Sequence, residues 1–128
     1  MRVLHPQRFE VNEAWIAFRI NDAPIRTEVD GDFNCMALMD AASCFILGFE
    51  FFSATAVEPT QQEFRRLIET ARSHKQELPT TLFIAREVEA DEIVREATEQ
   101  GIEVVRVPES ELEIFIGEAR EGFAEQFG

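Results

Sequence analysis

Residues 33–52 read FNCMALMDAASCFILGFEFF, and this stretch decides how the first half of the chain folds. Residues 33–39 and 44–52 are nearly continuous apolar runs of the length of a β-strand. Between them, residues 40–43 have the polar ends and small central residues of a four-residue hairpin loop. The stretch therefore predicts two antiparallel strands joined by a short turn.

A further strand is predicted upstream of this hairpin, at residues 15–20. Its side chains alternate, with one face made by Ile16, Phe18 and Ile20 and the other by Trp15, Ala17 and Arg19. Residues 21–32 are polar and contain a proline and an Asp-Gly-Asp turn signal, with a short extended piece expected at residues 25–29. The first half of the chain is thus expected to form an antiparallel meander.

The second half changes to helical periodicity. Thr60 and Glu63 have the spacing of a capping box, in which each side chain accepts from the backbone of the other residue. Apolar residues then recur at helical spacing, at Phe64, Leu67, Ile68 and Ala71. This pattern predicts an amphipathic helix over residues 61–74.

Two strands and two helices are predicted to follow. The strands are expected at residues 80–85 and 103–107, and the helices at residues 89–100 and 110–127. The last helix has one apolar stripe, made by Leu112, Phe115, Ile116, Ala119, Phe123 and Phe127. The order β-β-β-α-β-α-β-α predicts an α/β fold with one mixed five-stranded sheet flanked by helices, in a single domain over residues 1–128.

The hairpin also carries a resemblance to a known superfamily. The run Met39-Asp40-Ala41-Ala42-Ser43-Cys44-Phe45-Ile46-Leu47-Gly48, preceded by Trp15-Ile16-Ala17-Phe18, is similar to the central strands of integrase and transposase catalytic cores. In those cores an apolar strand ends in Asp-x-x-Ser and is followed by an aromatic-Ile-x-Gly strand. The chain thus resembles the ribonuclease-H-like superfamily, whose order of elements it matches over nearly its whole length.

The resemblance implies chemistry that this chain does not fully support. Such cores cut or transfer phosphodiesters with two divalent metal ions about 4 Å apart, held by converging carboxylates. The family places Asp on the first strand, Asp after the fourth strand and Glu in the last helix. Here the first position is Phe18 and the second is Arg86-Glu87, and only the third has candidates, at Glu109, Glu111 and Glu113. Because Phe18 cannot bind a metal and Arg86 would itself supply a cation, we expect a catalytically degenerate core with no metal or cofactor.

An active alternative uses a displaced carboxylate set. Asp22, Glu87 and Glu111 would then hold Mg²⁺ or Mn²⁺, and the protein would be a nuclease or phosphotransferase. The plainer interpretation is that the acids of the last helix form its solvated face. Asp40, in the same interpretation, accepts hydrogen bonds from its own hairpin turn.

The net charge limits the expected partners. The chain has 25 Asp and Glu against 12 Lys and Arg, a net charge of −13, which opposes binding to nucleic acid or an anionic membrane. No stretch approaches the roughly 20 apolar residues needed to span a membrane, and residues 1–10 do not resemble a signal peptide, so a cytoplasmic location is expected. The two histidines and the scattered glycines form neither a catalytic triad nor a nucleotide-binding loop.

The cysteines are expected to be free thiols. With a loop over residues 40–43, Met39 lies opposite Cys44 and Cys35 lies opposite Gly48. The two cysteines are then separated by four residues along the ladder, or roughly 14 Å, about twice the limit for a disulfide.

We therefore expect a non-catalytic, bacterial ribonuclease-H-like domain that serves self-association or protein interaction. A homodimer is expected to bury the strand at residues 44–52, an apolar sheet edge whose single charge is Glu50, or the helix beside it. Two alternatives remain open. The N-terminal segment, through Phe9 and Val11, or the first helix could cover this edge within one chain, and the domain could instead bind a small ligand in a pocket.

Overall fold

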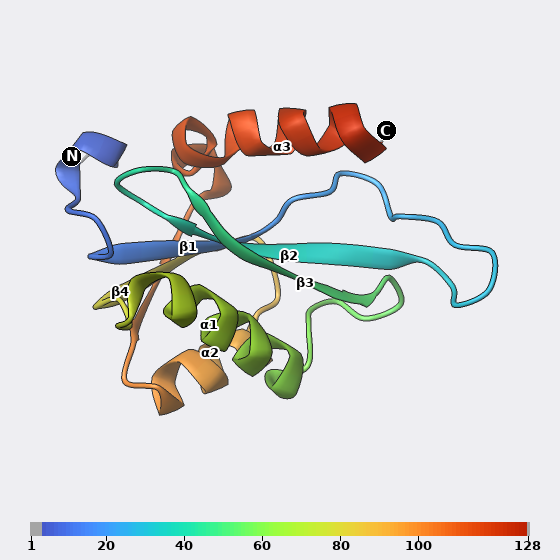
Figure 1. The fold of residues 1–128 in the computed structure, drawn as a ribbon, viewed down its shortest axis with the longest axis horizontal. Helices are drawn as coiled ribbons and strands as arrows, with labels where there is room; N and C mark the ends of the chain where they lie inside the picture. The colour runs from blue at the N-terminus through green and yellow to red at the C-terminus, as the bar shows by residue number, and fades with distance from the viewer. Residues whose placement is uncertain (1–3, 128) are drawn as a thin grey trace.

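One mixed sheet of five strands forms the centre of the computed structural model, which describes residues 4–127 apart from the side chain of Phe127 (Figure 1). The strands are β1 (Ala14–Arg19), β2 (Phe33–Asp40), β3 (Ile46–Ser53), β4 (Thr81–Ala85) and β5 (Glu103–Val107). They are ordered β3-β2-β1-β4-β5, with antiparallel pairing from β3 to β1 and parallel pairing from β1 to β5. The predicted fold class is confirmed.

Helices cover both faces of this sheet. The helices α1 (Gln61–Lys75) and α2 (Asp91–Glu99) lie on one face, and α3 (Glu113–Phe127) lies on the other (Figure 1). Single 3-10 turns, η1 (Pro6–Arg8) and η2 (Glu109–Glu111), precede β1 and α3. None of the helices in the described part of the chain is long and apolar enough to span a membrane.

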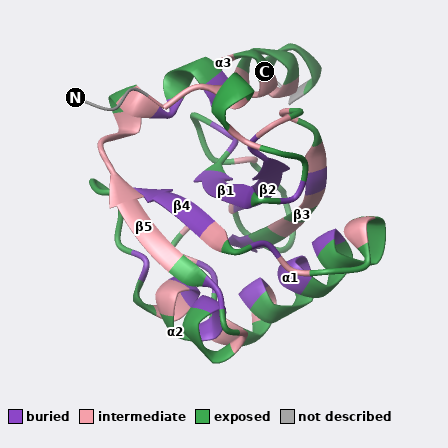
Figure 2. Cartoon of the chain, turned by 90° about the vertical axis from the view of Figure 1, so that its left-hand side faces the viewer, coloured by how far each residue is buried: buried purple, intermediate pink, exposed green. Residues whose placement is uncertain are grey.

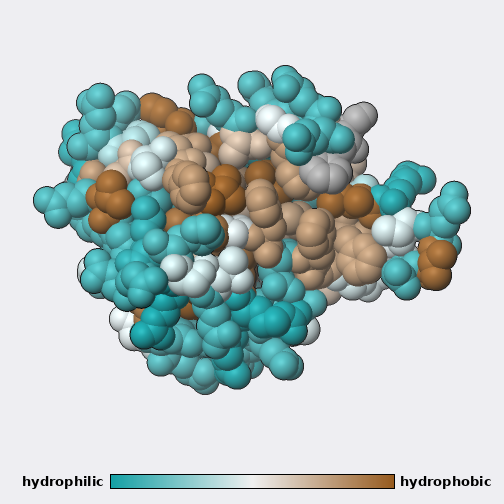
Figure 3. Space-filling model, in the orientation of Figure 1, coloured by the Kyte–Doolittle hydropathy of each residue, from teal (hydrophilic) through white to brown (hydrophobic). Residues whose placement is uncertain are grey.

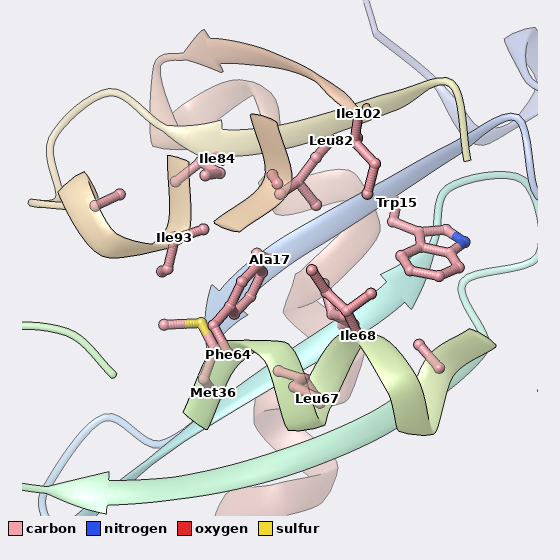
Figure 4. Close-up of a cluster of buried hydrophobic side chains, with 14 of the residues drawn as sticks. Trp15, Ala17, Met36, Phe64, Leu67, Ile68, Leu82, Ile84, Ile93 and Ile102 are labelled. Atoms are coloured by element: carbon pink, nitrogen blue, oxygen red, sulfur yellow. The ribbon is translucent and has the colours of Figure 1, made fainter. Parts of the chain in front are cut away.

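The central strand β1 is buried on both faces because its neighbours and both helix layers cover it. Trp15 and Ala17 belong to the core beneath α1 and α2, whereas Ile16 and Phe18 belong to the core beneath α3. Figure 4 shows the first of these cores, with Trp15 and Ala17 among side chains of α1, α2, β2 and β4. Figure 2 shows β1 and β4 buried and β5, at the sheet edge, less so.

The helix α1 begins where the capping box predicts. Thr60 Oγ1 accepts from the Glu63 amide at 3.1 Å, and Glu63 Oε1 accepts from the Thr60 amide at 2.8 Å. The helix packs closely on β3: a Cβ added at Gly48 would lie only 2.9 Å from Thr70 Cγ2. Gly48 therefore permits this close approach.

The predicted register of the hairpin is wrong. Met39 pairs with Ile46 rather than Cys44, and Cys35 pairs with Phe51 rather than Gly48, with a register shift between Leu38 and Met39. The reason is a longer loop. Cys44 adopts a left-handed conformation (φ 59°), its amide donates to the Asp40 carbonyl at 2.8 Å, and β3 begins only at Ile46. Both cysteines are nevertheless free thiols, as predicted.

Two helix starts also differ from the prediction. The last helix begins as η2, and α3 starts at Glu113. The helix α2 starts at Asp91, where a distant side chain caps it: Glu58 Oε1 accepts from the amides of Glu92 and Ile93 at 2.9 and 3.1 Å. The extended piece expected at residues 25–29 is reduced to one bridge from Ile25 to Phe33. In the apolar stripe of α3, the side chain of Phe127 lies outside the described residues.

Candidate functional site

The candidate site lies beyond the carboxyl ends of β1 and β4. These strands run parallel, so their ends meet at one edge of the sheet, which is where open α/β sheets bind ligands. A pocket of about 250 Å³ opens there, and we call it the end pocket. Most of its lining is apolar, and its charged side chains are Arg19, Glu89, Glu109 and Arg120.

Arg120, from the middle of α3, supplies the best-anchored charge of the end pocket. Its side chain is 20% exposed, and Nη2 lies 3.0 Å from Glu109 Oε1. Nε donates to the Arg19 carbonyl at 3.1 Å, and the guanidinium carbon lies 5.9 Å from the centre of the Phe18 ring. Glu113 Oε1 lies 3.7 Å from Nη1. A fixed cation and an aromatic ring thus lie together beside the carboxyl end of β1.

This geometry changes the assignment of the site's cation. Arg86 was expected to supply it, but Arg86 is exposed and does not line the end pocket. The nearby Arg106 instead holds the turn after β4, donating to the carbonyl of Ala85 at 3.1 and 3.3 Å and to that of Val88. The cation of the site is therefore Arg120. Two acids assigned to the solvated face of the last helix, Glu109 and Glu113, pair with it.

The displaced carboxylate set is not assembled. Asp22 lies in the loop after β1, where it lines a separate pocket of about 440 Å³. Glu87 lies in the turn after β4 and accepts from the Glu109 amide at 2.9 Å, while Glu111 lies in η2. Among the described residues, no group of three His, Cys, Asp or Glu side chains could hold a metal ion.

Asp40 plays the structural part predicted for it, with one addition. Its Oδ2 accepts from the amide and hydroxyl of Ser43 at 2.9 and 2.7 Å, which confirms the hydrogen bonds within the turn. Its Oδ1 also accepts from the Asn12 amide at 2.6 Å, and Asn12 Oδ1 accepts from Trp15 Nε1 at 2.7 Å. The buried carboxylate therefore joins the hairpin loop to the segment that leads into β1.

Arg120 could have been found from the sequence. It lies four residues after Ile116 and three before Phe123, so it falls within the apolar stripe of the helix rather than on its charged face. A single arginine in such a stripe needs an acidic partner or a pocket. Glu113, seven residues earlier on the same side of the helix, is one of the acids it meets.

In comparisons by sequence, no family model and no curated protein matches the chain. By structure, it is similar to a chain of the simian T-cell lymphotropic virus intasome solved in complex with the PP2A regulatory subunit B56 gamma. That match has a TM-score of 0.59 and 15% identity, and covers 98% of this chain and 43% of that one. The chain therefore spans less than half the length of this structural relative.

A second solved structure resembles the chain in the same way. It is the catalytic core domain of HTLV-2 integrase, solved with magnesium in a dimeric form, with a TM-score of 0.50 and 12% identity. The match covers 98% of this chain and 71% of that core. The fold is that of the ribonuclease-H-like integrase cores, and at these identities the similarity extends to the fold alone.

Proposed function

We propose that this chain is a catalytically degenerate ribonuclease-H-like domain that acts by associating with protein, first of all with a second copy of itself. The observation that carries the first half of the proposal is the contact of Arg120 with Phe18 and Glu109 at the carboxyl end of β1. The positive guanidinium at this place repels a divalent cation, and the carboxylate of Glu109 is already paired with it.

The second half of the proposal is supported by the edge strand β3. No strand in the described part of the chain pairs with its outer side, and large apolar side chains of β3 and of the loop before it are exposed: Phe49 is 46%, Phe51 50% and Phe45 53% exposed. Figure 3 shows an apolar band between the hydrophilic helices of the two layers. An exposed apolar edge of this kind is prone to pair with another strand.

Other contacts in the described part of the chain cover β3 in part: α1 packs against Gly48, and the Phe49 ring lies 6.4 Å from that of Phe123 in α3. The expected deterrent charge, Glu50, is paired with Arg66 of α1 at 2.8 Å. In the N-terminal segment, Phe9 packs against the rings of Phe83 and Phe115, and Val11 is exposed. A second copy, related by a twofold axis, supplies an identical edge for this one to meet.

Light scattering at micromolar concentration tests this association. We expect a mass near twice 14.7 kDa that falls on dilution. Phe49→Glu should return the monomer mass, because it places an unpaired charge in the apolar seam. The matched control is Ile114→Glu, which adds the same charge at an exposed apolar position of α3 and should leave the dimer intact. A constant mass of 14.7 kDa in the unmodified protein contradicts the proposed self-association.

A further inference from the structure

The end pocket lies where the two cores of the protein meet beyond the end of the sheet. Its buried walls come from both: Met36, Phe52 and Ile84 belong to the core beneath α1 and α2, and Phe18, Leu112 and Ile116 to the core beneath α3. These side chains are held by packing on the sheet, so the cavity is preformed. Val57 and Val88 are exposed at its rim.

The size and lining of the end pocket define what it can hold. Apolar cavities of about 150 Å³ stay dry and accept benzene. At about 250 Å³, this pocket has room for one ring with a short substituent. Its charged groups are only Arg19, Glu89, Glu109 and Arg120 in a mostly apolar lining, and a few polar groups in such a lining are what orients an apolar ligand.

Arg120 has hydrogen-bonding capacity left over. Nε donates to the Arg19 carbonyl and Nη2 to Glu109. Nη1 is 3.7 Å from Glu113 Oε1, which is beyond hydrogen-bond length. These N–H groups are available to an oxygen of a bound molecule.

The charge balance of the end pocket excludes strongly charged ligands. Arg19 and Arg120 are matched by Glu89 and Glu109, so the lining carries no net charge. A nucleotide or other phosphate-rich ligand meets two carboxylates here, and the whole protein carries −13. A ligand with at most one anionic group is compatible with this lining.

We propose that the end pocket binds a small, largely apolar molecule of about one substituted ring, with a carbonyl or carboxylate oxygen that accepts from the guanidinium of Arg120. This function goes beyond protein association, and the two can be tested separately. A ligand in the end pocket lies where the catalytic cores that the fold resembles carry out metal chemistry. Apolar packing and one hydrogen-bonding group, rather than a metal ion, hold it there.

Titration of the ¹⁵N-labelled protein with phenylacetate, phenylacetamide and toluene, followed by NMR, tests the proposal. We expect phenylacetate or phenylacetamide to shift the amides of Phe18, Ala85 and Leu112 with a Kd of about 1 mM or tighter, as befits a molecule of about ten heavy atoms. Toluene should bind more weakly at the same place. The stronger of the first two probes identifies the oxygen as carboxylate or carbonyl. No shift at these amides with any probe overturns the proposal.

Two variants separate the polar contact from the cavity. Arg120→Met should weaken the oxygen-bearing probes about tenfold and leave toluene within about twofold. The matched control, Arg95→Met, removes an exposed arginine that pairs with Glu92. It should change neither the affinity for the oxygen-bearing probes nor that for toluene. Ala85→Leu, which fills the pocket at the end of β4, should abolish binding of all three probes in a protein whose circular dichroism is unchanged. The proposed binding site is contradicted if the folded Ala85→Leu variant binds the probes as well as the unmodified protein does. It is also contradicted if Arg120→Met weakens toluene and phenylacetate equally.

Discussion

At the scale of single residues, two buried or half-buried charges have opposite uses. Arg120 contacts Phe18 and Glu109 in the end pocket, with donors to spare. Asp40 is 0% exposed, and its two oxygens accept three hydrogen bonds from Asn12 and Ser43. The first residue is available to a ligand, whereas the second is fully used in holding the loop.

Asp40→Asn should therefore destabilise the fold. The substitution replaces one acceptor oxygen by an NH₂ group that faces another donor, and it removes the charge from the remaining hydrogen bonds. A loss of about 2–3 kcal/mol in the free energy of unfolding is expected. Urea denaturation measures it, with Asp30→Asn in an exposed loop as the matched control. A loss equal to that of the control contradicts the structural role.

At the scale of elements, α1 and α2 are joined by a buried carboxylate. Glu96 of α2 is 1% exposed and accepts from Arg65 and Gln61 of α1 and from Gln100. Burial by itself raises the pKa of Glu96, but the hydrogen bonds from Arg65, Gln100 and Gln61 outweigh it and lower the pKa below the ordinary 4.5. The ionised form is thus the one that holds the helices together.

This shift predicts how stability depends on pH. A carboxylate whose pKa is lowered by folding stabilises the protein above its unfolded pKa of 4.5, and this contribution is lost as the pH falls below that value. Glu96→Gln should therefore lower the urea midpoint at about pH 7, with a difference that shrinks at about pH 3.5. Glu121→Gln, at an exposed position of α3 away from this cluster, is the control. A difference that does not change with pH contradicts the account.

The elements were predictable because their periodicity is local. The capping box of Thr60 and Glu63, the apolar alternation of β1 and the Gly101 turn fix most boundaries within two residues. The hairpin register was not predictable, because it depends on the left-handed conformation of Cys44, a residue with no intrinsic preference for it. The cap of α2 by Glu58 was also missed, since the two are joined only by the tertiary fold.

The location of the candidate site could be predicted from the sequence, but not all of the residues that form it. The resemblance to integrase cores located it at the ends of β1 and β4, and the substitution of Phe18 for an acid was visible in the sequence. The cation of the site, expected from Arg86, comes instead from Arg120 of α3, which contacts Phe18 across 102 positions of sequence. The place of Arg120 in the apolar stripe of the last helix was the available signal, although periodicity does not specify how α3 crosses the sheet.

At the scale of the whole molecule, two borders of the sheet differ in exposure and in expected function: the edge strand β3 and the carboxyl ends of β1 and β4. The β3 edge presents Phe49 and Phe51 to solvent, and we propose that a second copy covers it. The carboxyl ends of β1 and β4 enclose the end pocket instead. The proposed association and the proposed ligand binding thus use different surfaces, although Phe52 of β3 lines the end pocket and connects them.

We propose that the integrase-like fold is present here without metal-dependent chemistry, and titration calorimetry with Mn²⁺ is the experiment that tests this proposal. We predict no stoichiometric site with a Kd in the micromolar range, because Arg120 and Phe18 lie together beside the carboxyl end of β1 and the acids Asp22, Glu87 and Glu111 are not assembled. A stoichiometric micromolar site, accompanied by cleavage of nucleic acid that is lost on Glu111→Gln, would contradict it.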